Sequence, residues 1–186
     1  GNVQKGDKVL IVGAGPIGMF AMLSAKAVGA KVYMTDLLDG RLEKAKEMGA
    51  DGVANGKNPE ELKALNQKVT NGDGFDVCVE CCGAPETFLT CIDQAAFAAK
   101  IILIGNGKRD TTFLHSILLK KELNVFGSRN AYNSDFEQVI DILASGKVDV
   151  EPLVSAEYRL EQTGEAFEAL RNNSGTLMKV LLKAAD

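Results

Sequence analysis

The run Lys8-Val-Leu-Ile-Val12, followed directly by Gly13-Ala14-Gly15-Pro16-Ile17-Gly18, decides the fold of this chain. The four consecutive apolar residues 9–12 are typical of a buried parallel strand. An amphipathic stretch then runs to residue 28 and stops at Gly29, as a helix does. A G-x-G-x-x-G turn between a buried strand and a helix is the setting of a dinucleotide-binding loop.

Each residue of this loop has a physical role in that setting. Gly13 permits the tight turn, Gly15 lets the backbone approach a pyrophosphate, and Gly18 lets the helix pack close to the strand. Pro16 and Ile17 begin the helix, where a missing N–H costs nothing. The free N–H groups and the helix dipole attract a phosphate. We therefore favour binding over plain turn chemistry, which needs the same glycines.

An acidic residue ends the next predicted strand. Asp36 lies 18 residues after Gly18, at the end of the run 31–36. A carboxylate there accepts hydrogen bonds from the adenosine ribose and repels a 2′-phosphate, which favours NAD over NADP. Arg41 complicates this prediction, because a nearby arginine can accommodate that phosphate. Arg41 as a solvated residue at a helix start is the other interpretation, and both stay open.

Short apolar runs alternate with amphipathic stretches over residues 1–150. Strands are predicted at 8–12, 31–36, 52–54, 75–80, 100–104 and 123–127. Helices are predicted at 16–28, 41–48, after Asn58-Pro59, at 85–94 and 114–121, and from Ser134 to Gly146. This alternation predicts an α/β fold with a doubly wound six-stranded parallel sheet, the Rossmann fold, in the strand order 3-2-1-4-5-6.

The last of these helices and the residues after it are less regular. The helix from Ser134 is expected to turn four apolar residues inward, Phe136, Val139, Ile140 and Leu143. Residues 151–186 predict a strand–helix–strand appendage, with strands at 153–158 and 177–183. In its helix, at 161–171, the residues expected to face inward are Ala166, Phe167 and Leu170. The chain therefore divides into a dinucleotide-binding domain, 1–150, and a C-terminal segment, 151–186.

Composition narrows the class of partner. With 186 residues, 46% of them hydrophobic, the chain can bury one good core. A net charge of −4 and a pI near 5.2 argue against nucleic acid or an anionic membrane as the main partner. No apolar run approaches the roughly 20 residues that span a bilayer, and no charged-then-apolar leader is evident. These features predict a soluble cytoplasmic protein.

The sequence offers no catalytic or metal-binding group. Cys78, Cys81, Cys82 and Cys91 have the spacing C-x2-C-C-x8-C, but the first lies in a predicted strand and the last on the following helix. No second CxxC pair matches a zinc site, so reduced thiols are expected. The single histidine, His115, lies among apolar residues and is interpreted as structural. The Tyr-x-x-x-Lys pair of a short dehydrogenase is absent.

The loops after strands four, five and six should border the same crevice as the glycine loop. They comprise residues 80–83, 104–106 and 127–130. Gly83, Gly105 and Gly127 would let the backbone approach a ligand, or they are turn glycines only. For any one of them the two interpretations are equally good.

Taken in order and spacing, these pieces resemble the medium-chain, zinc-dependent alcohol and polyol dehydrogenases, closest to the sorbitol, threonine and sugar-acid branch. The resemblance runs over nearly the whole chain. It includes Gly6-Asp7-Lys8-Val9 before the glycine loop, Thr35-Asp36 with Arg41-Leu42, Phe75-Asp76-Val77 with Glu80-Cys81, Leu143 to Val148, and Pro152-Leu153-Val154.

The resemblance implies a set of NAD-binding residues. The pyrophosphate would contact Gly13, Gly15, Pro16, Ile17 and Gly18, with Asp36 and Arg41 flanking the adenosine ribose. Backbone lining the adenine and nicotinamide ends would come from Cys82, Ile104, Asn106 and Ser128. Arg129 stands where the family varies, and its role is open. Cys82 replaces a threonine that relatives often carry, so the chain has a thiol there in place of a hydroxyl.

The resemblance also implies a larger enzyme. Such dehydrogenases begin with a separate substrate domain that holds the catalytic zinc, and residues 151–186 resemble the segment that completes it. The chain would then be the cofactor-binding part of an alcohol, polyol or sugar-acid dehydrogenase, inactive alone. The full-length protein would be a homodimer or homotetramer, paired through the edge strand at 123–127. A stand-alone NAD(H)-sensing module is the alternative, and a complete short dehydrogenase ranks third.

Overall fold

Six parallel strands form the central sheet of the computed structural model, which describes residues 1–173 and 175–184. They are β1 (Lys8–Val12), β2 (Lys31–Asp36), β3 (Gly52–Asn55), β4 (Phe75–Glu80), β5 (Ala95–Leu103) and β6 (Asn124–Gly127). Their order is β3-β2-β1-β4-β5-β6, and every neighbouring pair is parallel. The predicted Rossmann topology is therefore confirmed.

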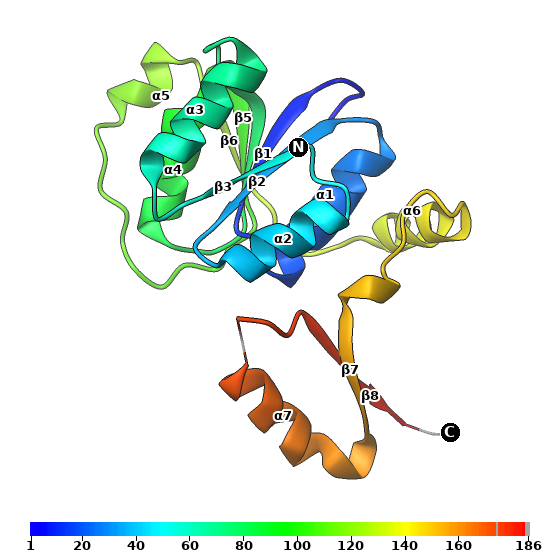
Figure 1. The fold of residues 1–186 in the computed structure, drawn as a ribbon. Coiled ribbons are helices and arrows are strands. Elements are labelled where there is room, and N and C mark those ends of the chain that lie inside the picture. Colours follow the sequence, from blue (N-terminus) through cyan, green and yellow to red (C-terminus); the bar gives the residue numbers. More distant parts are fainter. Residues whose placement is uncertain (174, 185–186) are drawn as a thin grey trace.

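Helices cover both faces of this sheet (Figure 1). One face carries α1 (Pro16–Ala27) and α2 (Asp39–Glu47), and the other carries α3 (Pro59–Thr70), α4 (Pro85–Gln94) and α5 (Ser116–Lys120). Alternate residues of β1 supply the two cores, because successive strand side chains point to opposite faces. Val9 and Ile11 join the α1–α2 core, whereas Leu10 and Val12 join the α3–α4 core.

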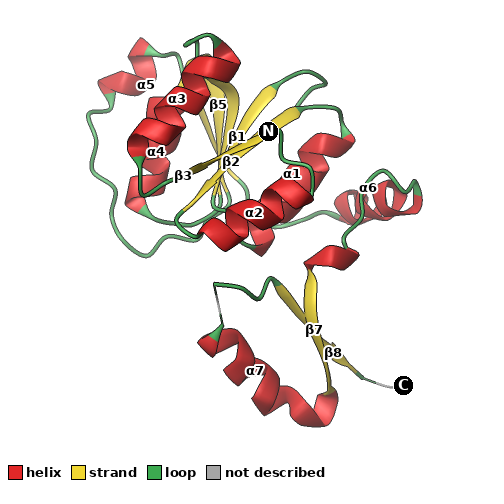
Figure 2. Ribbon diagram, in the orientation of Figure 1, coloured by secondary structure: helices red, strands yellow, loops and turns green. Residues whose placement is uncertain are grey.

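The C-terminal residues form the predicted strand–helix–strand unit (Figure 2). It contains the 3-10 turn η1 (Glu151–Leu153), β7 (Val154–Arg159), the 3-10 turn η2 (Leu160–Gln162), α7 (Thr163–Asn172) and β8 (Lys179–Lys183). Strands β7 and β8 pair in parallel as a second sheet. Leu153 and Met178 are buried within the α1–α2 core cluster, so they attach this unit to the main domain.

Several predicted boundaries are off by one or more residues, and two of these differences have local reasons. Strand β5 begins at Ala95 rather than residue 100, because α4 ends directly in extended backbone at that residue. Helix α6 (Asn133–Ala144) begins before Ser134. Asp135 makes the capping contact instead, since its carboxylate accepts the backbone N–H of Tyr132 at 2.7 Å.

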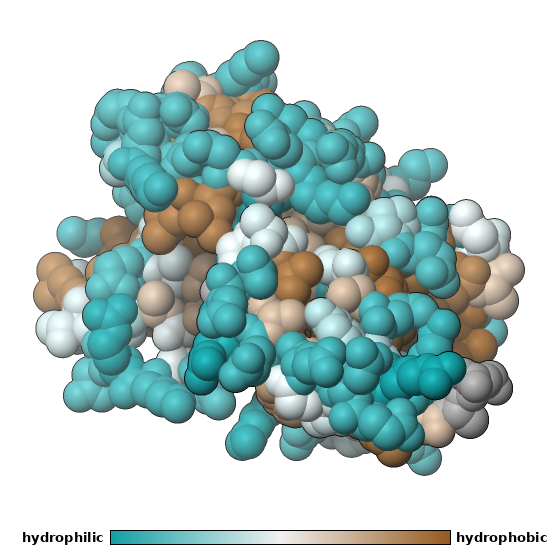
Figure 3. Space-filling view, turned by 60° about the horizontal axis from the view of Figure 1, so that its bottom comes forward, coloured by the Kyte–Doolittle hydropathy of each residue, from teal (hydrophilic) through white to brown (hydrophobic). Residues whose placement is uncertain are grey.

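The prediction that α6 turns its apolar face inward is also wrong. Phe136, Val139, Ile140 and Leu143 are 41–63% exposed, because α6 stands apart from the sheet rather than packing on it (Figure 1). On α7, Ala166 is buried as predicted and Leu170 is half-buried, but Phe167 is exposed. Figure 3 shows apolar residues reaching the surface in separate patches between hydrophilic ones. Within the two described ranges, no helix has the length and apolarity to cross a membrane.

Asp51 anchors the edge of the sheet opposite the glycine loop. Its carboxylate accepts the backbone N–H of Val32 at 2.8 Å and the Lys26 Nζ at 2.9 Å, with Lys31 Nζ at 3.4 Å. Burial alone raises the pKa of this carboxyl, but hydrogen bonds from Lys26 and Val32 and the two lysine charges outweigh it. The net pKa lies below the ordinary value.

Asp51→Ala is expected to lower the free energy of unfolding by about 1–3 kcal/mol at neutral pH, because the Val32 N–H loses its partner. The carboxyl pKa is lower in the folded than in the unfolded chain, so its stabilisation is complete above the unfolded value, about 3.9. That stabilisation disappears as pH falls through the folded value. Urea denaturation of the unaltered chain and of Asp51→Ala should show that the difference between their free energies of unfolding becomes smaller as the pH falls. A constant difference would contradict the prediction.

Candidate functional site

The candidate site lies where the strand order reverses. From β1 the chain builds outward to β2 and β3 on one side, and it returns through β4 on the other. The loops after β1 and β4 therefore diverge at the carboxyl edge of the sheet, which is where open α/β sheets bind ligands. The glycine loop follows β1, and residues 81–84 follow β4.

Two of the three loop glycines are required by the chain's own packing. Gly13 has φ +106°, and a Cβ there would lie 2.6 Å from the Cys82 Sγ. A Cβ on Gly18 would lie 1.8 Å from the backbone oxygen of Gly13. The Gly13 N–H donates to the Thr35 carbonyl at 2.8 Å, which ties the loop to β2. These contacts match the tight-turn and close-packing roles predicted for Gly13 and Gly18.

Gly15 differs, because no protein atom requires a glycine there. Its φ of −75° suits any residue, and a Cβ would meet only the Arg41 Nη1 at 3.7 Å. Gly15 is the N-cap of α1 and Pro16 follows it, with no side chain capping the helix. The first N–H groups of a helix have no intrahelical acceptor. The space beside Gly15 therefore faces uncapped donors, the chemistry that a pyrophosphate needs.

Asp36 stands beside this space and holds the loop. Its Oδ2 accepts the Ala14 N–H at 2.8 Å, and its Oδ1 accepts the Leu38 N–H at 3.0 Å. Arg41 Nη1 lies 3.5 Å from Oδ2. The side chain of Asp36 is only 8% exposed and that of Arg41 only 22%. The interpretation of Arg41 as a solvated residue is therefore wrong, since it pairs with Asp36 at the crevice.

A cleft of about 650 Å³ continues from Asp36 between α3 and α4. Its lining includes Thr35, Leu37, Gly56, Ala84 and Thr87. Among the residues that line it, sequence reasoning assigned only Asp36 to the cofactor site. A signal was present, because Leu37, Gly56 and Ala84 all lie just beyond the carboxyl ends of strands. The separation of α3 and α4 that opens the cleft has no such signal.

The two neighbouring cysteines lie against the glycine loop, in surroundings that disfavour their thiolate forms. The Cys82 thiol donates to the Val12 carbonyl at 3.5 Å. Burial raises the pKa of Cys82 to about 11, the Glu80 and Asp36 charges add to this effect, and Arg41 opposes it. Burial likewise raises the pKa of Cys81 to about 12. Both thiols are protonated at neutral pH, and all four cysteines are free, as predicted.

The other predicted residues lie farther along the same edge. Ile104 is half-buried after β5, Asn106 is exposed, and the Ser128 N–H donates to the Leu103 carbonyl at 2.9 Å. Arg129 is exposed after β6. In the part of the chain that the structure describes, no hydrogen bond joins Asn106, Ser128 or Arg129 to the glycine loop. Hydrogen bonds and close contacts thus join Gly13 to Gly18 with Asp36, Arg41 and Cys82, and Ile104 packs against the core cluster that contains Ala14.

The glycines of these loops serve packing between the loops. A Cβ on Gly105 would lie 2.1 Å from the backbone nitrogen of Gly83, and one on Gly83 would lie 2.7 Å from that of Gly107. The backbones of the two loops are therefore closer than side chains permit. Gly127 has no atom within 4 Å of an added Cβ, so neither packing nor a tight contact explains it.

A family model described as zinc-binding dehydrogenase matches residues 16–145. The chain belongs to this family. The match runs from the start of α1 to the end of α6 and includes Asp36, Arg41 and the loop after β4. The family that the sequence motifs resemble is therefore confirmed.

Individual relatives agree with this membership. Human sorbitol dehydrogenase is 38% identical over 98% of this chain and 51% of its own length. The (R,R)-butanediol dehydrogenase of Neisseria gonorrhoeae is 33% identical over 97% of this chain and 51% of its own. An Escherichia coli alcohol dehydrogenase crystallised with NADH is 29% identical with a TM-score of 0.88, covering 97% of this chain and 53% of its own. The chain spans about half the length of these relatives.

Two further findings concern this zinc-binding dehydrogenase domain. Across residues 1–173 and 175–184, no group of three or more His, Cys, Asp and Glu side chains is placed to hold a metal ion. His115 is exposed as the N-cap residue of α5, and its interpretation as a structural histidine stays a prediction.

Proposed function

We propose that this chain is the NAD(H)-binding part of a zinc-dependent dehydrogenase that oxidises a secondary alcohol, a polyol or a sugar acid. The observation that carries the proposal is the uncapped start of α1 facing the space beside Gly15, with the Asp36 carboxylate next to it. Family membership supports the same function. The relatives reported above are named dehydrogenases, which gives no support to a stand-alone sensing module.

The crevice suits the parts of the cofactor in turn. The N–H groups of Ile17 and Gly18, at the uncapped helix start, would hold the pyrophosphate. Asp36 would accept hydrogen bonds from the adenosine ribose. The cleft between α3 and α4, lined by Leu37 and Ala84, would take the adenine ring.

At the other end of the cofactor, the backbones of Cys82, Ile104, Asn106 and Ser128, together with Arg129, would border the nicotinamide. When bound, the nicotinamide supplies the hydride-transfer chemistry, whereas this chain binds and orients it.

We further propose that residues 1–150 form the cofactor domain and that 151–186 complete a substrate domain belonging to the remaining half of the protein. A two-stranded sheet such as β7–β8 is marginal alone. The exposed apolar face of α6 is a second surface that this half would cover. The catalytic zinc would also lie there, in line with the family description.

We also propose that the full-length protein is a homodimer or homotetramer in the cytoplasm. Strand β6 is the edge of the sheet and exposes Val125 and Phe126, which suits pairing with a second copy. The four free thiols suit a reducing compartment. Sedimentation of the full-length protein as a monomer at high concentration would contradict the pairing.

The test is titration of NADH fluorescence with this chain. We expect saturable binding of NADH and no turnover of sorbitol or other alcohols, even with added zinc. A folded chain that leaves the NADH fluorescence unchanged would overturn the cofactor proposal. Robust turnover of any alcohol would overturn the division between the two halves.

A further inference from the structure

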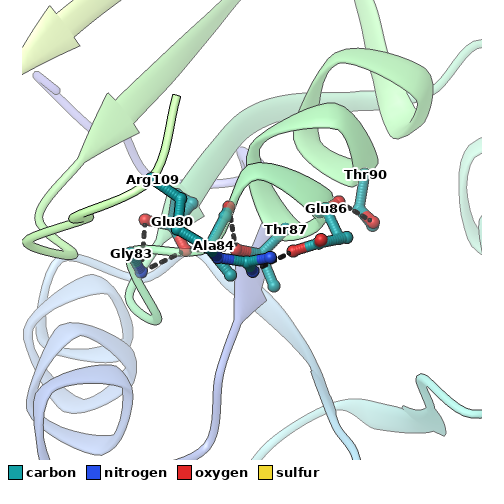
Figure 4. A network of polar contacts seen from close by, with 7 residues as sticks. All are labelled: Glu80, Gly83, Ala84, Glu86, Thr87, Thr90 and Arg109. Carbon is teal, nitrogen blue, oxygen red and sulfur yellow. Dashed lines mark hydrogen bonds and ion pairs between the residues drawn. The ribbon is translucent and has the colours of Figure 1, made fainter. Parts of the chain in front are cut away.

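One buried carboxylate holds the loop that follows β4. Glu80, the last residue of that strand, is 2% exposed. Its Oε1 accepts the backbone N–H groups of Cys82 at 2.8 Å and Gly83 at 2.9 Å, and the Thr87 hydroxyl at 2.6 Å. Its Oε2 lies 3.1 Å from the same Gly83 nitrogen. Figure 4 shows the side chain reaching from β4 to the loop and to the first turn of α4.

Glu80 also contacts the loop that follows β5. Its backbone carbonyl accepts the N–H groups of Ile104 at 2.9 Å and Gly105 at 3.0 Å. A Cβ on Gly105 would lie 2.4 Å from the Glu80 Oε2. One residue therefore touches both the loop after β4 and the loop after β5. The Arg109–Glu86 ion pair in the same view is exposed on both sides and contributes little.

The burial of this carboxylate requires an explanation. Removing a charge from water costs several kcal/mol unless hydrogen bonds compensate. Here the compensating groups are backbone N–H donors and a hydroxyl, which fix local geometry rather than neutralise a charge. An apolar strand end would avoid the cost but would leave the N–H groups of Cys82 and Gly83 without this acceptor.

Glu80 is linked to the glycine loop through Cys82. The Cys82 N–H is bonded to Glu80, while the Cys82 thiol bonds to Val12 and lies 2.6 Å from a Cβ built on Gly13. A shift of Cys82 by a few tenths of an ångström would move it toward or away from the glycine loop.

We infer that Glu80 is a positioning residue, whose carboxylate fixes residues 81–84 in the shape that receives NAD(H) against the glycine loop, while its backbone carbonyl holds Ile104 and Gly105 beside them. This inference rests on the proposed function. Glu80 touches no cofactor atom itself and acts through the backbones of Cys82, Gly83 and Gly105.

The test compares NADH titrations of the unaltered chain with those of Glu80→Ala and Glu80→Gln. Alanine removes both acceptor oxygens, so we expect the Kd to rise by about tenfold or more, the equivalent of one good hydrogen bond. Glutamine keeps one carbonyl oxygen for Cys82, Gly83 and Thr87. Its amide nitrogen replaces Oε2 and cannot accept the longer 3.1 Å hydrogen bond from the Gly83 N–H. We expect it to bind within about threefold of the unaltered chain. Rescue by glutamine separates hydrogen-bonded positioning from charge.

Asp51→Ala is the matched control, because Asp51 also bonds a backbone N–H but lies at the opposite edge of the sheet. We expect its NADH Kd to stay unchanged although its stability falls. If Glu80→Ala does not fold, Glu80→Asp replaces it, since the shorter side chain withdraws both oxygens and should weaken binding similarly. Amide hydrogen exchange at Cys82 and Gly83 should be faster in either variant.

The possible results separate the two proposals. An unaltered chain that does not bind NADH contradicts the proposed function, while hydrogen exchange still tests whether Glu80 holds the loop. Binding that is equal in the unaltered chain and in Glu80→Ala or Glu80→Asp overturns the positioning role. An equal loss of NADH affinity in Asp51→Ala also overturns it, because the effect would then follow stability alone.

Discussion

Replacing Gly18 by alanine is expected to destabilise the chain by about 3 kcal/mol or more and to abolish NADH binding. The new Cβ would lie 1.8 Å from the Gly13 oxygen and 2.9 Å from its carbonyl carbon, both backbone atoms. Gly13 cannot easily move aside, because its N–H is bonded to Thr35 and its φ of +106° is already specialised. Urea denaturation and NADH titration would measure the two effects.

Gly15→Ala is the matched variant. Its Cβ would meet only the Arg41 Nη1, at 3.7 Å, on backbone that alanine adopts freely. We expect stability within about 0.5 kcal/mol of the unaltered chain. NADH binding should nevertheless fall by about tenfold or more, because the methyl group occupies the space proposed for the pyrophosphate. Unchanged NADH affinity in Gly15→Ala would remove this space from the site. An unchanged stability of Gly18→Ala would contradict the packing argument.

These glycines show why the topology could be predicted from sequence. The sequence alternates buried strands with helices. Because crossovers between parallel strands are right-handed, such strands and helices can assemble in only a few topologies. Both β1 and β2 have near-continuous apolar runs because helices cover both faces of the sheet. Asp36 could be located for the same reason, since the end of β2 follows from the pattern.

What could not be predicted depends on distances across the fold. The periodicity of α6 identifies an apolar face, but Phe136 and Ile140 are exposed because the helix stands away from the sheet. Glu80 ends a buried strand, which is a visible signal. Its acceptor role depends on how Cys82 and Gly83 turn back toward it, and this turn has no periodicity. The cleft between α3 and α4 likewise follows from helix separation rather than residue type.

Asp36→Ser is expected to weaken NADH binding by about tenfold or more and to improve binding of NADPH relative to NADH. The shorter side chain would lose the hydrogen bonds that Asp36 is proposed to accept from the ribose hydroxyls. It would also lose the hydrogen bonds from the N–H groups of Ala14 and Leu38. Removing the carboxylate ends its repulsion of a 2′-phosphate. It also ends the 3.5 Å contact between the Asp36 carboxylate and the Arg41 guanidinium, whose positive charge attracts that phosphate.

The ratio of the two affinities is the decisive measurement, because a general loosening of the glycine loop would weaken NADH and NADPH alike. Asp39→Ser supplies the control: it removes the same charge three residues away, from an exposed side chain that bonds Asn55 rather than the glycine loop. Its ratio should equal that of the unaltered chain. If Asp36→Ser leaves both titration curves unchanged, Asp36 is not part of the site. If both variants shift the ratio equally, discrimination reflects net charge near the crevice, and the specific geometry of Asp36 and Arg41 has no part in it.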